Sequence, residues 1–203
     1  MTVSFRHCRI QITIPFLSLT AFLLLMDHTG VAVCGLFAAL LHEVGHLAAM
    51  MICRRYPNSI RFTAFGAEIQ TNSVVGSYGM DALVAVAGPI VNLTLWAITA
   101  AFMKTSAASN ALQLFSLSNA FLGIFNLMPV EPLDGGQALL SFLSLFLSRE
   151  KACRTVMICS FIVLVPMAIL GFLVLFKSYW NVTLLLAVLY MIFLLLMKNG
   201  RYE

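Results

Sequence analysis

The chain has 203 residues, of which 61% are hydrophobic and 10% charged, and its mean hydropathy is +0.97. This composition excludes an ordinary soluble domain, because long apolar runs separate the charged residues, as in a multi-span membrane protein. The net charge of +4 is therefore assigned to membrane topology, and nucleic acid is not an expected partner. Five scattered cysteines without a CxxC pair indicate neither a disulfide framework nor a cysteine zinc site.

The first two apolar runs predict two transmembrane helices, at residues 10–26 and 30–53. Pro15 falls in the first turns of the earlier helix, where proline is tolerated. That run shows no small-residue cleavage site, so we expect it to be retained rather than removed as a signal peptide. The second run contains the sequence LHEVGHL at residues 41–47, and Glu43 is its only formally charged residue.

The HEVGH sequence predicts a metal site. His42 and His46 are four residues apart, so they share one face of a helix and can bind one metal ion together. Glu43 lies about 100° round the helix, where a general base could reach a metal-bound water without being a ligand. A carboxylate at the centre of a bilayer costs about 2.5–3.5 kcal/mol, which a zinc ion would compensate. HExxH also arises by chance on solvated helix faces, but an apolar helix offers no such face.

The next segments predict a hairpin and a third span. Residues 60–69 are β-branched and aromatic and are broken by Gly66, which predicts a small β-hairpin at the membrane edge, with a surface loop as the alternative. The third span, at residues 81–103, contains AGPIVN, whose small residues permit close helix contact. Asn92 needs a partner in hydrocarbon. A helix–helix hydrogen bond and a contact with an active centre are both open hypotheses for it.

The fourth predicted span, at residues 109–127, runs into NLMPVEPLDGG, whose two prolines and two glycines cannot continue a regular helix. Broken backbone at membrane depth is tolerated where it lines a cavity or is buried in protein. A helical run at residues 137–147 and two further spans at 156–176 and 180–197 follow. We therefore expect residues 1–203 to form a single transmembrane domain, an all-α membrane fold of six helices with a small membrane-edge β-hairpin.

The basic residues predict the orientation in a cell membrane. When the six spans alternate, all of the 12 lysine and arginine residues except Lys104 and Lys177 fall on the side of the N-terminus. Positive charge concentrates on the cytoplasmic side of membrane proteins. Both termini are therefore predicted to be cytoplasmic.

Asp134 is the expected third metal ligand, because it is held between a proline turn and two glycines. Two histidines and a carboxylate leave the fourth zinc position open for water, as catalytic sites do. Glu131 competes for this role, although a carboxylate facing water at a cavity mouth is the favoured interpretation of it. Zinc would lower the pKa of the water, Glu43 would take its proton, and an amide such as Asn126 or Asn92 would assist the oxyanion.

Taken together, these motifs resemble those of the site-2 protease family of intramembrane zinc metalloproteases. HEVGH matches the HExxH of the second core helix, and Gly88-Pro89-x-x-Asn92 matches the GPxxN element. Asn126-x-x-Pro129-x-x-x-x-Asp134-Gly135 matches the NPDG motif, whose aspartate is the third zinc ligand in the family. The layout of about residues 1–200 is most similar to the stage IV sporulation protein FB-like branch. Members of that branch often carry a CBS domain and other branches carry PDZ domains, but we expect neither here.

The resemblance implies a zinc endopeptidase that cuts transmembrane segments of single-span membrane proteins inside the lipid bilayer, with a regulatory membrane protein as a candidate partner. It also implies that residues 60–70 lie near the substrate, which could pair with them as an added strand. Phe62, Phe65 and Gly66 are the candidates for that contact. The alternatives are a homologue that binds membrane clients without cutting them and, less favoured, a metal-ion transporter.

Overall fold

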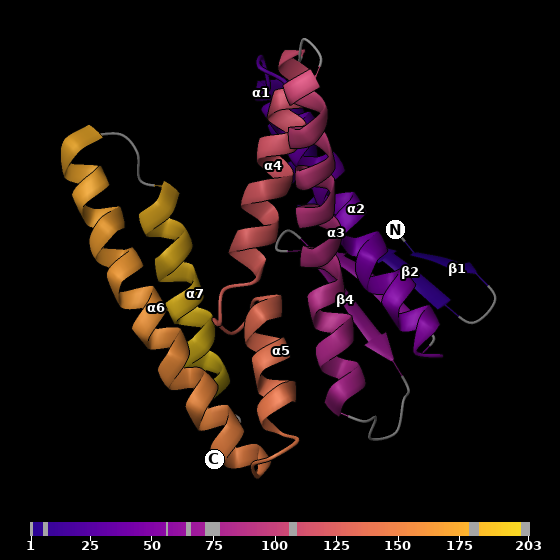
Figure 1. Cartoon of the computed structure of the whole chain (residues 1–203), viewed down its shortest axis with the longest axis vertical. Coiled ribbons are helices and arrows are strands. Elements are labelled where there is room, and N and C mark those ends of the chain that lie inside the picture. Colours follow the sequence, from indigo (N-terminus) through magenta and orange to yellow (C-terminus); the bar gives the residue numbers. More distant parts are fainter. Residues whose placement is uncertain are drawn as a thin grey trace. The chain divides into compact units, whose positions relative to one another are not determined.

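The computed structural model describes residues 2–5, 8–55, 57–63, 66–71, 78–105, 109–178 and 183–199. Contacts divide the chain into two compact units, residues 1–76 with 87–124 (unit 1) and residues 77–86 with 125–203 (unit 2). The elements, labelled in Figure 1, are β1 (Thr2–Phe5), β2 (Cys8–Ile12), α1 (Ile14–Met26), α2 (Val31–Ile52), β3 (Pro57–Thr63), β4 (Gly66–Thr71), α3 (Tyr78–Thr105), α4 (Asn110–Asn126), α5 (Asp134–Leu143), α6 (Arg149–Ser178) and α7 (Thr183–Asn199).

The helices have the composition of a membrane protein. Among the residues that the structure describes, three helices are long and apolar enough to cross a membrane, at Val31–Ile52, Tyr78–Lys104 and Arg149–Lys177. Two shorter apolar helices cover Ile14–Met26 and Leu184–Leu195. The predicted helical character is therefore confirmed, whereas six spans and the cytoplasmic location of both termini stay predictions.

The strands form one sheet in the order β1-β2-β3-β4. β3 and β4 are antiparallel, with Thr63 opposite Gly66, which confirms the predicted hairpin. Gly66 is the first paired residue of β4 and not a break in the pairing. β2 pairs in parallel with β3, with Ile10 opposite Ile60, and β1 pairs antiparallel with β2. The sheet thus has four strands, whereas the sequence predicted only the two strands of a hairpin.

The predicted start of the first span at residue 10 is wrong, because α1 begins at Ile14 and residues 8–12 are a strand. Polar Arg9 and Gln11 alternate with apolar neighbours there, which is the period of a strand. No charged residue separates the strand from the apolar helix. Hydrophobic composition therefore predicts one continuous span where the structure has a strand and a helix.

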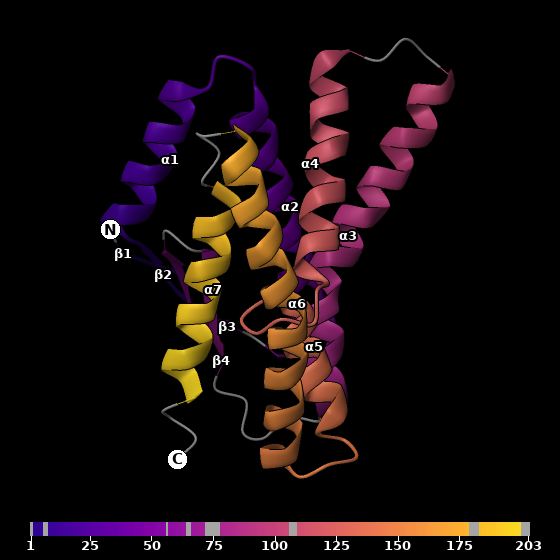
Figure 2. The same cartoon turned by 90° about the vertical axis from the view of Figure 1, so that its left-hand side faces the viewer.

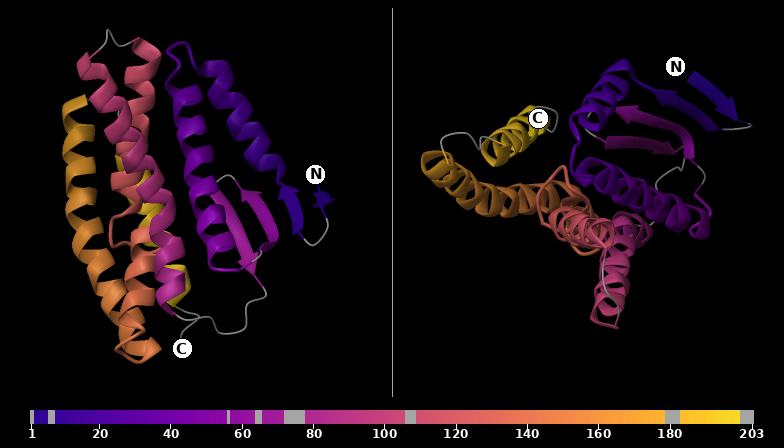
Figure 3. Two further views of the ribbon diagram at one scale, coloured as in Figure 1. Left: turned by 45° about the vertical axis from the view of Figure 1, so that its right-hand side comes forward. Right: turned by 90° about the horizontal axis from the view of Figure 1, so that it is seen from above.

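Thr13 fastens α1 to the sheet within unit 1. Its amide and its hydroxyl both donate hydrogen bonds to the carbonyl of Phe62, at 3.1 and 2.9 Å. The rings of Phe16 and Phe62 pack with their centroids 5.6 Å apart. Figure 3 shows the sheet beside α1 and α2, the helix that carries the HEVGH sequence.

The carboxylate of Asp27 caps the N-terminus of α2. Its oxygens accept hydrogen bonds from the amides of Gly30, Ala32 and Val33, at 2.8, 2.9 and 3.1 Å. These amides have no partner within the helix, so an acidic side chain stabilises them. Desolvation raises the pKa of Asp27, but hydrogen bonds from Val33, Thr29 and Gly30 outweigh it and hold the pKa below its usual value.

Unit 2 is built around the pair of helices α6 and α7, which lie side by side (Figure 2). They approach closely at Gly171, where an added Cβ would lie 3.1 Å from the backbone of Leu185. Their buried core is apolar and consists of Val130, Leu164, Val188 and Leu195. One member of this core, Val130, comes from the proline-rich break between α4 and α5.

The centre of the break, at Val130 and Glu131, is buried, whereas Leu127 and Pro132 are exposed. The amide of Glu131 donates to the hydroxyl of Ser160 on α6 at 3.0 Å, and that hydroxyl donates to the carbonyl of Val156 at 2.8 Å. Glu131 is 6% exposed, so its interpretation as a carboxylate facing water is wrong. The reason is local: the neighbouring Val130 is anchored in the core, which draws Glu131 into the interior with it.

Candidate metal centre

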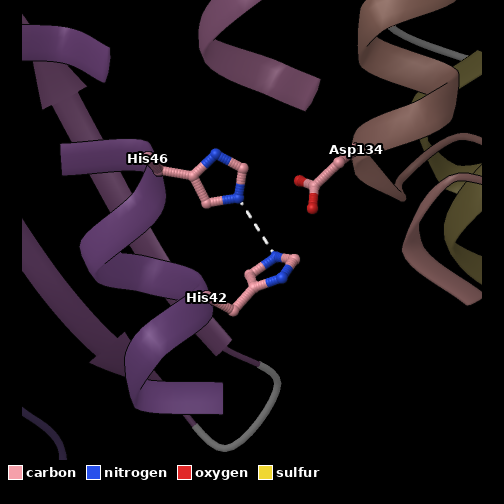
Figure 4. A group of neighbouring side chains, drawn as sticks. All are labelled: His42, His46 and Asp134. Carbon is pink, nitrogen blue, oxygen red and sulfur yellow. Dashed lines mark hydrogen bonds between the residues drawn. The ribbon is translucent and has the colours of Figure 1, made fainter. Parts of the chain in front are cut away.

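Two histidines lie buried on one face of α2. His42 and His46 are 5% and 8% exposed, and their ring centroids are 4.7 Å apart. Their Nε2 atoms are 3.1 Å apart, as the dashed line in Figure 4 marks. Two zinc–nitrogen bonds of about 2.05 Å that meet at a tetrahedral angle would place the nitrogens about 3.3 Å apart. The predicted shared face is confirmed, and the spacing of the two nitrogens suits one shared ion.

Asn92 on α3 orients the ring of His42. Its amide nitrogen donates to the carbonyl of Ala38 at 3.1 Å and to Oδ1 of Asn119 at 2.8 Å. Its remaining polar atom, Oδ1, lies within hydrogen-bond distance of His42 Nδ1. A carbonyl oxygen can only accept, so Nδ1 carries the proton and Nε2 keeps its lone pair. A metal-binding histidine typically has such a hydrogen-bond partner on the ring nitrogen that does not bind the metal.

Asn92 makes interhelical hydrogen bonds, as one hypothesis predicts, and the same amide contacts His42. That this contact belongs to an active centre stays a prediction. Asn92 is 0% exposed, and its amide oxygen and nitrogen are both engaged within unit 1. An amide in this state is poorly placed to meet the oxyanion of a substrate. The geometry favours a positioning role for Asn92.

Sequence reasoning missed Asn119, the fully buried residue of α4 that accepts from Asn92. Its own amide nitrogen donates to the carbonyl of Phe115 at 2.8 Å. The signal in the sequence was a polar amide in an apolar helix, the same signal that singled out Asn92. Nothing in the sequence told which helix it faces.

Position 88 has no room for a side chain, because Gly88 lies directly against the two rings. An added Cβ there would lie 2.8 Å from Nε2 of His42 and closer still to Nε2 of His46. Gly45 on α2 faces the same contact, since its Cβ would lie 3.0 Å from the carbonyl of Ala87. The two glycines let α2 and α3 approach closely, as the small residues of the third span predict.

Asp134 belongs to unit 2 and is the first residue of α5, where Figure 4 draws it as sticks. Carboxylates are favoured at this end of a helix by its dipole. The two following glycines are required by the backbone: an added Cβ at Gly135 would clash with the carbonyl of Leu127, and one at Gly136 would lie 2.5 Å from the backbone of Val130. The glycines let the break fold tightly against the start of α5.

The remaining predicted site residues have plainer settings. Glu43 is half-buried on α2 beside His42, and Asn126 is the half-buried last residue of α4. Phe62 lies on β3 between β2 and β4, and Gly66 begins β4. Phe65 lies outside the described residues. The catalytic and substrate-binding roles assigned to these residues stay predictions.

The fold and this arrangement define a class of helical membrane proteins with a buried histidine pair, in which a buried amide contacts one of the two histidines. Comparisons with known proteins narrow the class. Residues 97–170 match the model of peptidase family M50, a range that includes the proline-rich break but not the HEVGH sequence.

The most informative relative among curated proteins is stage IV sporulation protein FB of Bacillus subtilis (strain 168). The two are 31% identical over an alignment of 149 residues. The alignment covers 69% of this chain and 50% of that protein. The chain thus spans about half the length of the curated relative. A site-2 protease from Methanocaldococcus jannaschii shares the fold, with a TM-score of 0.66 at 22% identity, over 95% of this chain and 92% of that one. The chain belongs to the site-2 protease family, peptidase family M50.

Proposed function

We propose that this membrane protein is a zinc endopeptidase that cuts transmembrane segments of other membrane proteins. The observation that carries the proposal is the buried pair of imidazoles, with Nε2 atoms 3.1 Å apart and the lone pair of one ring directed by Asn92. Membership of a protease family supplies the reaction class. Family membership alone leaves the metal open, so the donor set has to be tested against zinc.

The donor set fits zinc. His42, His46 and Asp134 each offer one ligand atom, and among the described residues they are a group that could hold a metal ion. Two imidazole nitrogens and one carboxylate oxygen are the donors of many catalytic zinc sites, which keep a fourth position open. We propose that these three side chains hold the ion.

A zinc ion held there would polarise a peptide carbonyl and lower the pKa of water. The protein's own groups have separate tasks. Glu43, half-buried and adjacent in sequence to His42, is the proposed general base, which accepts the proton of the attacking water and passes it to the leaving amine. Asn126 is the proposed donor to the oxyanion. Asn92 is not proposed for that task, because its amide already serves His42.

The proposed substrate is a single-span membrane protein whose target segment unwinds, since the carbonyls of an intact helix are hydrogen-bonded. An extended segment binds most readily at the edge of a sheet. β4, which begins at Gly66, stands at one end of the strand order, whereas the strand of Phe62 is paired on both sides. We therefore assign the strand-pairing role to β4 and not to Phe62.

The test is co-expression of the chain with candidate single-span proteins from the same genome, in the unmodified form and as Glu43→Gln. Cleavage inside a transmembrane segment by the unmodified chain alone supports the proposal. Equal cleavage by both chains would refute the role of Glu43. Capture of a client without cleavage would favour a binding homologue, and zinc movement across vesicles would favour a transporter.

A further inference from the structure

Two fully buried asparagines join α3 to α4 in the interior of unit 1. A primary amide in an apolar interior is costly unless its donors and acceptor are bonded. Asn119 donates to the carbonyl of Phe115 at 2.8 Å and accepts from Asn92 at 2.8 Å. The donations of the pair run in one direction, from Asn92 to Asn119 and from Asn119 to Phe115.

This series of donations begins at the candidate metal ligand His42, whose Nδ1 lies within hydrogen-bond distance of the Asn92 oxygen. Both hydrogens of the Asn92 amide are taken, one by Asn119 Oδ1 and one by the carbonyl of Ala38. Rotating this amide by 180° would turn its oxygen toward two other oxygens and its nitrogen toward His42 Nδ1. The acceptor on Asn119 thus holds the oxygen of Asn92 toward His42, and the oxygen in turn requires the proton on Nδ1.

A second hydrogen bond between the same two helices provides a comparison. The hydroxyl of Thr99 on α3 donates to the hydroxyl of Ser116 on α4 at 2.8 Å. In the part of the chain that the structure describes, neither residue hydrogen-bonds to a histidine or to Asn92. A merely structural role for the Asn92–Asn119 bond would make it equivalent to this one.

We propose that Asn119 is a positioning residue for the metal centre, which acts through Asn92 to fix the tautomer and orientation of His42. The inference rests on the proposed metal-binding function, since the fixed lone pair on Nε2 matters for an ion bound there. Loss of a partner of a metal-bound histidine costs about 10- to 100-fold in metal affinity. Asn119 acts one step further away, so its loss should cost about tenfold, the low end of that range.

The experiment uses the purified full chain and three variants. Asn119→Leu removes the acceptor at similar volume. Asn119→Asp, in its neutral form, keeps an acceptor for Asn92 and a donor for Phe115. Thr99→Val removes the comparison bond. Zinc affinity is measured by competition with a chelator, and the ¹⁵N shifts of the histidine rings are measured in the metal-free protein. The chain has four histidines, so His42→Gln assigns the relevant signals.

The unmodified metal-free chain should show His42 with a protonated Nδ1 and an unprotonated Nε2. Asn119→Leu should bind zinc about tenfold more weakly and show a mixture of His42 tautomers. Asn119→Asp should restore both readouts, and Thr99→Val should match the unmodified chain in both.

Three results would overturn the inference: a protonated Nε2 on His42 in the unmodified chain, an Asn119→Leu variant with unchanged affinity and tautomer, or an equal loss in Thr99→Val. If Asn119→Leu fails to fold, Asn119→Ala replaces it and is judged by the same readouts. Absence of zinc binding by the unmodified chain would refute the proposed function instead, and the tautomer comparison would still decide the role of Asn119.

Discussion

The interiors of the two units are built from different side chains. The junction of α2, α3 and α4 in unit 1 buries five polar residues, namely His42, His46, Asn92, Ser116 and Asn119. The core between α6 and α7 in unit 2 is apolar, and the buried polar residues Glu131 and Ser160 lie where the proline-rich break meets α6. Among the described residues, buried polarity is thus concentrated around the two candidate histidine ligands.

The contrast has a physical meaning. A polar group in an apolar interior is tolerated when it is hydrogen-bonded, and a fully satisfied network fixes one arrangement of its members. Among the described residues, no buried side-chain nitrogen or oxygen lacks a hydrogen-bond partner. In unit 1 the buried Asn92, which Asn119 holds, contacts a histidine, whereas the core of unit 2 contributes stability through packing.

The largest expected effect comes from Glu43→Gln, which removes the proposed base from the polar junction. Cleavage of a membrane substrate should fall by about 10²- to 10⁴-fold, the usual contribution of a general base. Zinc affinity should stay within about threefold, because Glu43 is not a proposed ligand and the proposed ligands and the contact of Asn92 with His42 are unchanged. Single-turnover cleavage and chelator competition on the same preparation check the two readouts. A parallel loss of zinc would show that Glu43 holds the metal.

Leu164→Ala tests the other side of the comparison. Leu164 is fully buried in the α6–α7 core, and truncation of such a residue costs about 2–5 kcal/mol in the free energy of unfolding. Unfolding in mixed micelles should show that loss. Zinc affinity of the folded variant should match the unmodified chain, because Leu164 has no part in the proposed ligand set. A large loss of affinity would mean that the two interiors are not independent in this respect.

Gly88→Ala breaks the polar junction by adding one methyl group beside the two rings. Overpacking of this kind costs about 1–3 kcal/mol, which corresponds to about 5- to 150-fold in zinc affinity at 1.4 kcal/mol for each factor of ten. Gly35→Ala is the matched control on α2, because its added Cβ meets nothing within 4 Å. Zinc affinity of the two variants is compared by chelator competition. Equal affinity in both would contradict the close approach of α3 to the histidines.

The smallest expected effect is the pH dependence of Asp27, which caps α2 outside its spanning segment. Hydrogen bonds hold its pKa in the folded chain below its usual value, so the carboxylate stabilises the fold above about pH 4, the unfolded pKa. That stabilisation is lost as pH falls through the lowered folded pKa. Thermal unfolding of Asp27→Asn should therefore depend less on acid than that of the unmodified chain. An identical acid dependence would remove the cap from the explanation.

The sequence predicted most helices within a few residues, because long apolar runs and the proline-rich break leave few alternatives. It predicted the shared face of His42 and His46 from their spacing alone. It missed the pairing of β2 with β3, because Ile10 and Ile60 are fifty residues apart and strand partners that distant leave no local signal. It also missed β1, a strand of four residues. The direction in which the Asn119 side chain points from its apolar helix was also hidden, so Asn119 was overlooked. Glu131 was misplaced because no local pattern shows that its neighbour Val130 is anchored in the core.

The most direct test is X-ray absorption at the zinc edge of the zinc-loaded full chain, compared with Asp134→Asn. We predict two imidazole nitrogens at about 2.0–2.1 Å and carboxylate or water oxygens at about 2.0–2.2 Å, and a changed oxygen shell with weaker binding in the variant. A sulfur ligand at about 2.3 Å, or a spectrum and affinity unaffected by Asp134→Asn, would contradict a centre made of His42, His46 and Asp134.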